Sequence, residues 1–305
     1  MSTRFDGICP LPHLGVIRAE GEDAVKFLHG QLTHDFALLD MQHARLTAFL
    51  SAKGRMQASF IGFKRSPNEV LLVCSRDLLA PTLKRLSMFV LRAKARLTDA
   101  SADFLLYGLA GSAIEKIAGN PIVVSEKADL GQISVIGLAP AGATARALWV
   151  APAGTPAPAG ELLPEALWAW GEVQSGVATL TAPLVDAFVP QMLNYESVDG
   201  VSFKKGCYPG QEVVARSQFR GAIKRRAFLA HAEAELQAGQ EIFAASDPEQ
   251  ACGQVVQAAA APGGGWDAIV ALQLAAAEAG GLHAGSATGP ALALGRLPYA
   301  LKDDL

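Results

Sequence analysis

The chain has 305 residues, half of them apolar, and a formal net charge of -3. This length predicts two or three domains with a substantial core, and the mildly acidic balance disfavours a general nucleic-acid binder. The four cysteines form no Cys-x-x-Cys pair, so neither a zinc knuckle nor a protein-held iron–sulfur cluster is indicated. No apolar run is long enough to span a bilayer, and the first residues carry no signal-peptide pattern, which together predict a cytoplasmic protein.

Helical and strand patterns alternate through the first part of the chain. Apolar residues at helical spacing indicate helices, and period-two alternation indicates strands. These patterns predict, in order, a helix over 21–32, two strands within 45–64 with a turn at Lys53 and Gly54, a strand over 69–74, a helix over 77–90, a strand over 104–109 and a helix around Ile114.

The composition changes twice in the second half of the chain. Residues 139–160 are rich in Ala, Pro, Gly and Thr, which predicts loops around one short strand at 147–150. A helix follows over 163–175. After Arg226, short apolar segments separated by Gly, Pro and Asp predict a small β-barrel or sandwich.

The most distinctive stretch lies between residues 202 and 226. Cys207 follows Lys204 and Lys205 on a glycine-rich turn, and nearby cations favour the thiolate over the thiol. Residues 204–226 contain seven basic side chains and one acidic one, a balance of +6 that predicts contact with an anion. The plainer alternatives are a cysteine packed in a tight turn and a charged surface that is only solvated.

Residues 205–212 read Lys-Gly-Cys-Tyr-Pro-Gly-Gln-Glu, which resembles the signature of the YgfZ family. These folate-binding proteins are similar in fold to the aminomethyltransferase, or T-protein, of the glycine cleavage system. Further segments resemble the family in the same order along the chain, at residues 27–35, 51–56, 189–194 and 297–301.

The resemblance implies an α+β fold in which three domains form a ring around a central folate pocket. Residues 1–225 would form the folate-binding region, with two interleaved α+β subdomains, the second at roughly 45–100. Residues 226–305 would form the small C-terminal β-barrel. The implied cofactor is tetrahydrofolate, and the signature loop is expected to face its pocket.

The resemblance also implies the site residues. Cys207 is the expected functional thiol, Trp168 matches a pocket tryptophan, and Gln174 stands where related proteins often have Glu. No metal site is expected, since the spacing of His29, His34 and His43 fits no metal motif. The cofactor-binding set implied by the resemblance is Trp168, Gln174, Lys205, Tyr208, Gln211, Glu212, Arg220 and Arg226.

One departure from the aminomethyltransferase bears on activity. The position of the transferase's essential aspartate holds Pro81 here, and Asp77 lies four residues earlier. The leading hypothesis is therefore a folate-binding accessory protein that supports iron–sulfur cluster assembly or repair, and through its client enzymes tRNA modification. It requires no catalysis. The alternatives are a folate-dependent aminomethyl or one-carbon transferase and a tRNA-associated protein that uses the basic residues of 216–226.

Overall fold

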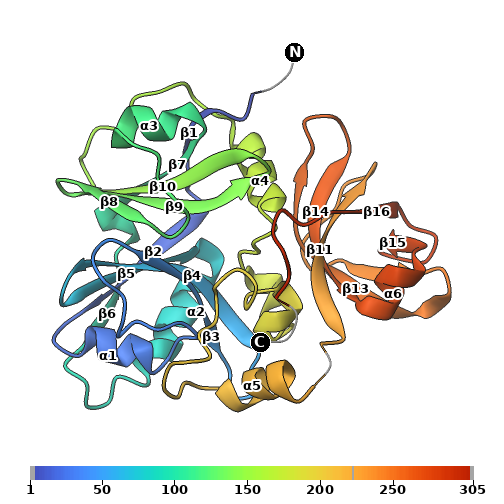
Figure 1. Ribbon diagram of the computed structural model, residues 1–305, viewed down its shortest axis with the longest axis horizontal. Coiled ribbons are helices and arrows are strands. Elements are labelled where there is room, and N and C mark those ends of the chain that lie inside the picture. Colours follow the sequence, from blue (N-terminus) through green and yellow to red (C-terminus); the bar gives the residue numbers. More distant parts are fainter. Residues whose placement is uncertain (1–3, 222, 303–305) are drawn as a thin grey trace.

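The computed structural model describes residues 4–221 and 223–302. Two five-stranded antiparallel sheets lie one above the other in Figure 1, and a closed six-stranded barrel lies beside them. Sheet A has the order β1-β7-β10-β9-β8, sheet B the order β3-β4-β5-β2-β6, and the barrel the order β11-β14-β13-β12-β15-β16. The α+β fold with a C-terminal barrel is thus confirmed. None of the described helices is both long and apolar enough to cross a membrane.

Sheet B is inserted in the chain between the first and second strands of sheet A. The predicted strand pair and its turn at Lys53 and Gly54 are confirmed, because β3 and β4 pair antiparallel around them. The elements of this part are β2 (Leu14–Glu20), α1 (Ala24–His29), β3 (Ala44–Leu50), β4 (Met56–Ser66), β5 (Glu69–Ser75), α2 (Arg76–Ser87) and β6 (Arg96–Asp99).

Sheet A contains a hairpin where the composition predicts loops. The elements are β1 (Gly7–Pro10), η1 (Ser101–Asp103), β7 (Phe104–Ala110), α3 (Ser112–Ala118), β8 (Lys127–Leu130), β9 (Ile133–Ala141) and β10 (Thr144–Pro152), followed by α4 (Glu165–Gln174). The predicted strand at 147–150 is confirmed and lies within β10, but the loop predicted before it is wrong, because residues 139–141 belong to β9 and residues 144–146 to β10. Both faces of β10 are buried, with Ala147 and Trp149 in one core cluster and Leu148 and Val150 in another. Small residues are needed there for close packing of two layers.

The barrel confirms the prediction drawn from the short apolar segments. Its elements are β11 (Arg225–Ala232), β12 (Glu241–Ala244), β13 (Asp247–Ala260), β14 (Trp266–Gln273), α6 (Leu274–Ala279), β15 (Leu282–Ala284) and β16 (Ala291–Gly295). The last two strands carry no clear pattern because they are short, yet β16 pairs with β11 and closes the barrel.

Helix α4 and a set of short turns join the sheets to the barrel. The joining segments are η2 (Ala182–Leu184), η3 (Pro190–Leu193) and α5 (Gln211–Phe219), of which α5 lies at the lower end of the view in Figure 1. On α4, Trp170 Nε1 and Gln174 Nε2 both donate to Asp267 Oδ2 of β14, at 2.7 and 2.8 Å. The barrel is therefore tied to the same helix that borders the two sheets.

Candidate functional site

A cavity of about 500 Å³ lies between the two sheets. Leu46 and Phe60 from sheet B, Leu138 and Leu148 from sheet A, and Trp168 from α4 form part of its apolar wall. Its volume is within the range of small-molecule binding sites, which are mostly apolar with a few fixed polar groups. The C-terminal segment reaches the cavity through Pro298 and Tyr299. We call this space the central cavity.

Helix α4 places an aromatic ring and a carboxylate side by side on the cavity wall. Trp168 and Glu172 are one helical turn apart and therefore lie on the same face. Gly108 in β7 makes room for the indole, because a Cβ at that position would lie 2.5 Å from the Trp168 ring. Trp168 Nε1 donates to Glu172 Oε1 at 3.0 Å, and Gln257 Nε2 of the barrel donates to Oε2 at 3.3 Å.

Glu172 is held as a charged group in this apolar space. Burial acts to raise the pKa of Glu172, but the hydrogen bond from His13 and the charge of Arg146 outweigh it, and the pKa is lowered. His13 Nε2 lies 3.5 Å from Glu172 Oε1, and Arg146 Nη2 lies 3.9 Å from the same oxygen. An ionised carboxylate on an apolar wall is suited to a ligand that presents hydrogen-bond donors.

Arg146 is the cation of this group. Its guanidinium carbon lies 4.5 Å from the centroid of the Trp168 ring, and the side chain is buried. Burial lowers the pKa of Arg146 to about 10, against the opposing charge of Glu172, so the guanidinium remains charged at neutral pH. Phe5 also stacks on the Trp168 ring, with the two centroids 6.2 Å apart, so these two contacts help to fix the plane of the indole.

The structure brings one predicted residue, Trp168, to the central cavity and does not bring Gln174 there. Gln174 turns toward the barrel and bonds Asp267 instead. Glu172, His13 and Arg146 are not among the site residues expected from the sequence. The available signal was a lone carboxylate one turn after Trp168, in a helix whose neighbouring residues are mostly apolar.

The signature loop lies outside the lining of the central cavity. Lys205 is buried, and its Nζ donates to the carbonyl of Leu32 at 2.7 Å and to that of His29. Burial lowers the pKa of Lys205 to about 8, and the amine lies 4.6 Å from the ring centroid of the buried Tyr208. Lys205 therefore fastens the loop to the turn after α1, whereas Cys207 is exposed.

The start of α5 packs against the turn between β3 and β4. Gly210 has φ of +79°, and a Cβ there would lie 2.6 Å from the carbonyl oxygen of Ser51. A Cβ on Gly54 would lie 2.7 Å from Cβ of Val213. Gln211 begins α5 and Glu212 is exposed in its first turn, where a carboxylate favours the helix dipole. Two of the segments that resemble the family are thus in direct contact.

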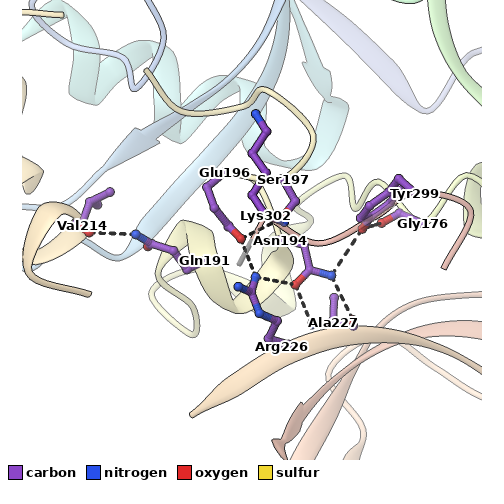
Figure 2. Close-up of polar contacts among 10 residues, drawn as sticks. All are labelled: Gly176, Gln191, Asn194, Glu196, Ser197, Val214, Arg226, Ala227, Tyr299 and Lys302. Carbon is purple, nitrogen blue, oxygen red and sulfur yellow. Dashed lines mark hydrogen bonds and ion pairs between the residues drawn. The ribbon is translucent and has the colours of Figure 1, made fainter. Parts of the chain in front are cut away.

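Arg226, a residue of the expected cofactor-binding set, is engaged by other residues of the protein. The side chain is buried, pairs with Glu196, and donates from Nη1 to Asn194 Oδ1 at 3.4 Å (Figure 2). Asn194 in turn donates to the carbonyl of Ala227 at 2.9 Å. This network joins η3 to the first barrel strand. Arg220, by contrast, is exposed at the end of α5.

The described residues contain no group of three or more His, Cys, Asp or Glu side chains that could hold a metal ion. The central cavity and the signature loop offer different chemical groups to a ligand. The central cavity offers a carboxylate, a guanidinium and an indole, and the signature loop offers an exposed thiol on a turn that is fastened at both ends.

No family model matches the chain. Among curated proteins, an uncharacterized protein of Haemophilus influenzae is 31% identical over 74% of this chain and 75% of its own length. The tRNA-modifying proteins YgfZ of Photobacterium profundum and Serratia proteamaculans are 32% and 31% identical, over 72% and 78% of this chain and 68% and 74% of their own lengths. A crystal structure of the glycine cleavage system aminomethyltransferase T from Bartonella henselae matches 98% of this chain and 88% of its own, with a TM-score of 0.71 and 16% identity. The chain has the aminomethyltransferase fold and belongs to the YgfZ family.

Proposed function

We propose that this protein binds tetrahydrofolate in the central cavity and thereby supports iron–sulfur enzymes, including those that modify tRNA. The observation that carries the proposal is Glu172, an ionised carboxylate on a mostly apolar wall beside Trp168. The names of the YgfZ relatives support the link to tRNA modification.

The residues of the central cavity fit a pterin ring. Such a ring is flat and apolar on its faces, and its amino-pyrimidine edge presents two neighbouring N–H donors. Trp168 lines one wall of the cavity. Glu172 Oε1 accepts from Trp168 and lies near His13 and Arg146, whereas Oε2 accepts only from Gln257 among the described residues and keeps accepting capacity for a ligand. The part of the folate beyond the pterin ring would extend out of the cavity past Val124 and Asp199, which line the cavity and are exposed. A bound reduced folate supplies one-carbon transfer or reducing capacity.

Cys207 is the proposed functional thiol. It is exposed, whereas Cys9, Cys74 and Cys252 are buried. Its turn is held by Lys205 on one side and by the contact of Gly210 with Ser51 on the other. A fixed, accessible thiol can meet a client protein while the cavity retains folate, and no catalytic turnover is required of it.

The structure gives less support to an aminomethyltransferase activity, because no carboxylate stands at the position of the transferase's essential aspartate. Pro81 is exposed in α2 and supplies no carboxylate. The oxygens of Asp77 accept hydrogen bonds from the Ser75 hydroxyl and the Ala182 backbone N–H, and Asp77 does not line the central cavity. We therefore favour a binding function over aminomethyl transfer.

A titration with tetrahydrofolate, followed by tryptophan fluorescence, tests the proposal. We expect saturable quenching that is largely lost in Trp168→Phe. Glu172→Gln should weaken binding about tenfold or more, because it removes hydrogen bonds to a charged acceptor. Gln174→Ala is the matched control on the same helix and should bind as the wild type does. Equal dissociation constants for wild type and Glu172→Gln would overturn the assignment of the cavity.

A further inference from the structure

A second surface, separate from the central cavity, gathers positive charge around the end of α5. It consists of Lys204, Arg216, Phe219, Arg220 and Lys224, which we call the basic α5 face. All five are exposed, and none of them lines the central cavity.

The geometry of α5 places an aromatic ring among these cations. Arg216 and Arg220 are one turn apart, and Phe219 lies between them in sequence with 55% of its surface exposed. The Phe219 ring contacts the Phe203 ring edge to face, with centroids 5.4 Å apart and planes at 73°. This contact brings the loop that carries Lys204 to the end of the helix.

The cations of the basic α5 face have no partner within the described protein. No carboxylate of residues 4–221 and 223–302 lies within 4.0 Å of Lys204, Arg216, Arg220 or Lys224, and their side chains donate no hydrogen bond to a described residue. The acid nearest in sequence on α5 is Glu212, one turn before Arg216. Within residues 204–224 the four exposed cations are accompanied by a single acidic residue, Glu212, in a chain whose overall charge is -3.

We propose that the basic α5 face binds a single-stranded segment of RNA. Guanidinium and ammonium groups would neutralise successive phosphates, and the exposed Phe219 ring would stack on a base. A duplex offers no unstacked base to such a ring, and a polyglutamate peptide offers no aromatic ring to stack on it. The proposal rests on this surface alone and is independent of the central cavity.

Fluorescence anisotropy with a labelled oligouridine of about twelve nucleotides tests the proposal. Arg216→Ala combined with Arg220→Ala should lower affinity and reduce the slope of log affinity against log salt by about 1.4, or about 0.7 for each lost phosphate contact. Phe219→Ala should lower the affinity for RNA about fivefold or more through lost stacking. Phe219→Tyr keeps an aromatic ring and should bind RNA as the wild type does. The matched control is Lys84→Ala combined with Arg85→Ala, two exposed cations near the end of α2, which should leave binding unchanged.

Urea unfolding of each variant separates lost binding from lost folding. If the α5 variants fold normally and bind RNA as the wild type does, the proposal is wrong. The proposal is also wrong if a polyglutamate peptide binds as tightly as RNA and Phe219→Ala changes the affinity for neither ligand. The basic α5 face would then be a binding site for an acidic protein segment. Folate titration of the same variants should be unaffected, so failure here is distinguishable from failure of the cavity assignment.

Discussion

At the scale of single residues, the two lysines beside Cys207 have different surroundings. Lys204 is exposed, whereas Lys205 is buried and directs its amine to two backbone carbonyls. The sequence places both lysines next to the thiol, but only the fold separates a charge that faces solvent from one that fastens the loop. In the proposed function, the exposure of Cys207 therefore matters as much as the charge near it.

Cys207 should be the first thiol to react with an alkylating probe in the native protein. Burial raises the pKa values of Cys9 and Cys74 to about 12 and also raises that of Cys252. At pH 8 the first two thiols are therefore ionised to only about one part in ten thousand, and all three are shielded from the probe. Mass spectrometry of timed samples gives the order of modification. Faster labelling of any buried cysteine would contradict this order.

Cys207→Ser should fold and bind tetrahydrofolate like the wild type, because the residue lies outside the central cavity. The same variant should fail to support iron–sulfur enzyme activity in cells if the thiol is functional. Complementation by wild type and variant, at matched protein levels, measures this. Full complementation by Cys207→Ser would remove the thiol from the proposed function.

At the scale of elements, the start of α5 depends on a glycine. Gly210 has φ of +79°, and a Cβ there would lie 2.6 Å from the carbonyl oxygen of Ser51 and 2.7 Å from Cα of Gly54. Gly210→Ala should therefore lower the free energy of unfolding by about 1–3 kcal/mol. Gly206→Ala is the control four residues earlier, because a Cβ there meets only His29 Nε2 at 3.6 Å. Urea unfolding of both variants should show a loss for Gly210→Ala alone; equal values would show that the close contact is easily relaxed.

The junction of η3 with β11 depends on the buried pair of Arg226 and Glu196. Arg226→Met leaves an uncompensated buried carboxylate and should destabilise the protein by about 3 kcal/mol. Adding Glu196→Gln should recover part of that loss, which a double-mutant cycle measures by urea unfolding. Arg225→Met, at the half-buried neighbouring position on β11, should change stability by less than about 0.5 kcal/mol. If the changes in the free energy of unfolding caused by Arg226→Met and Glu196→Gln are additive, the two side chains are not energetically coupled.

At the scale of the whole molecule, much of the architecture is predictable because local patterns persist for several residues. The hairpin around Lys53 and Gly54 has clear alternation, and the barrel shows several short apolar strands. Of the β9–β10 hairpin only the strand at 147–150 is predicted, because the small residues around it are selected by burial on both faces of β10. Composition alone reads such residues as loop.

The candidate site was predictable in part for a related reason. Trp168 follows from the resemblance, and Glu172 lies one turn from it on the same helix face. The partners of Glu172 are Arg146 of β10, Gln257 of the barrel and His13 before β2. They lie far apart in the chain, so no local sequence pattern predicts them. The burial of Arg226 was equally hidden, since its partner Glu196 lies 30 residues away in the chain.

The central claim, that the folate site is the cavity between the two sheets, is tested most directly by a crystal structure with a stable reduced folate. The account predicts the pterin ring against Trp168, with its amino-pyrimidine edge within hydrogen-bonding distance of Glu172. Density for the ligand beside Cys207, with the central cavity empty at saturating ligand, would contradict it.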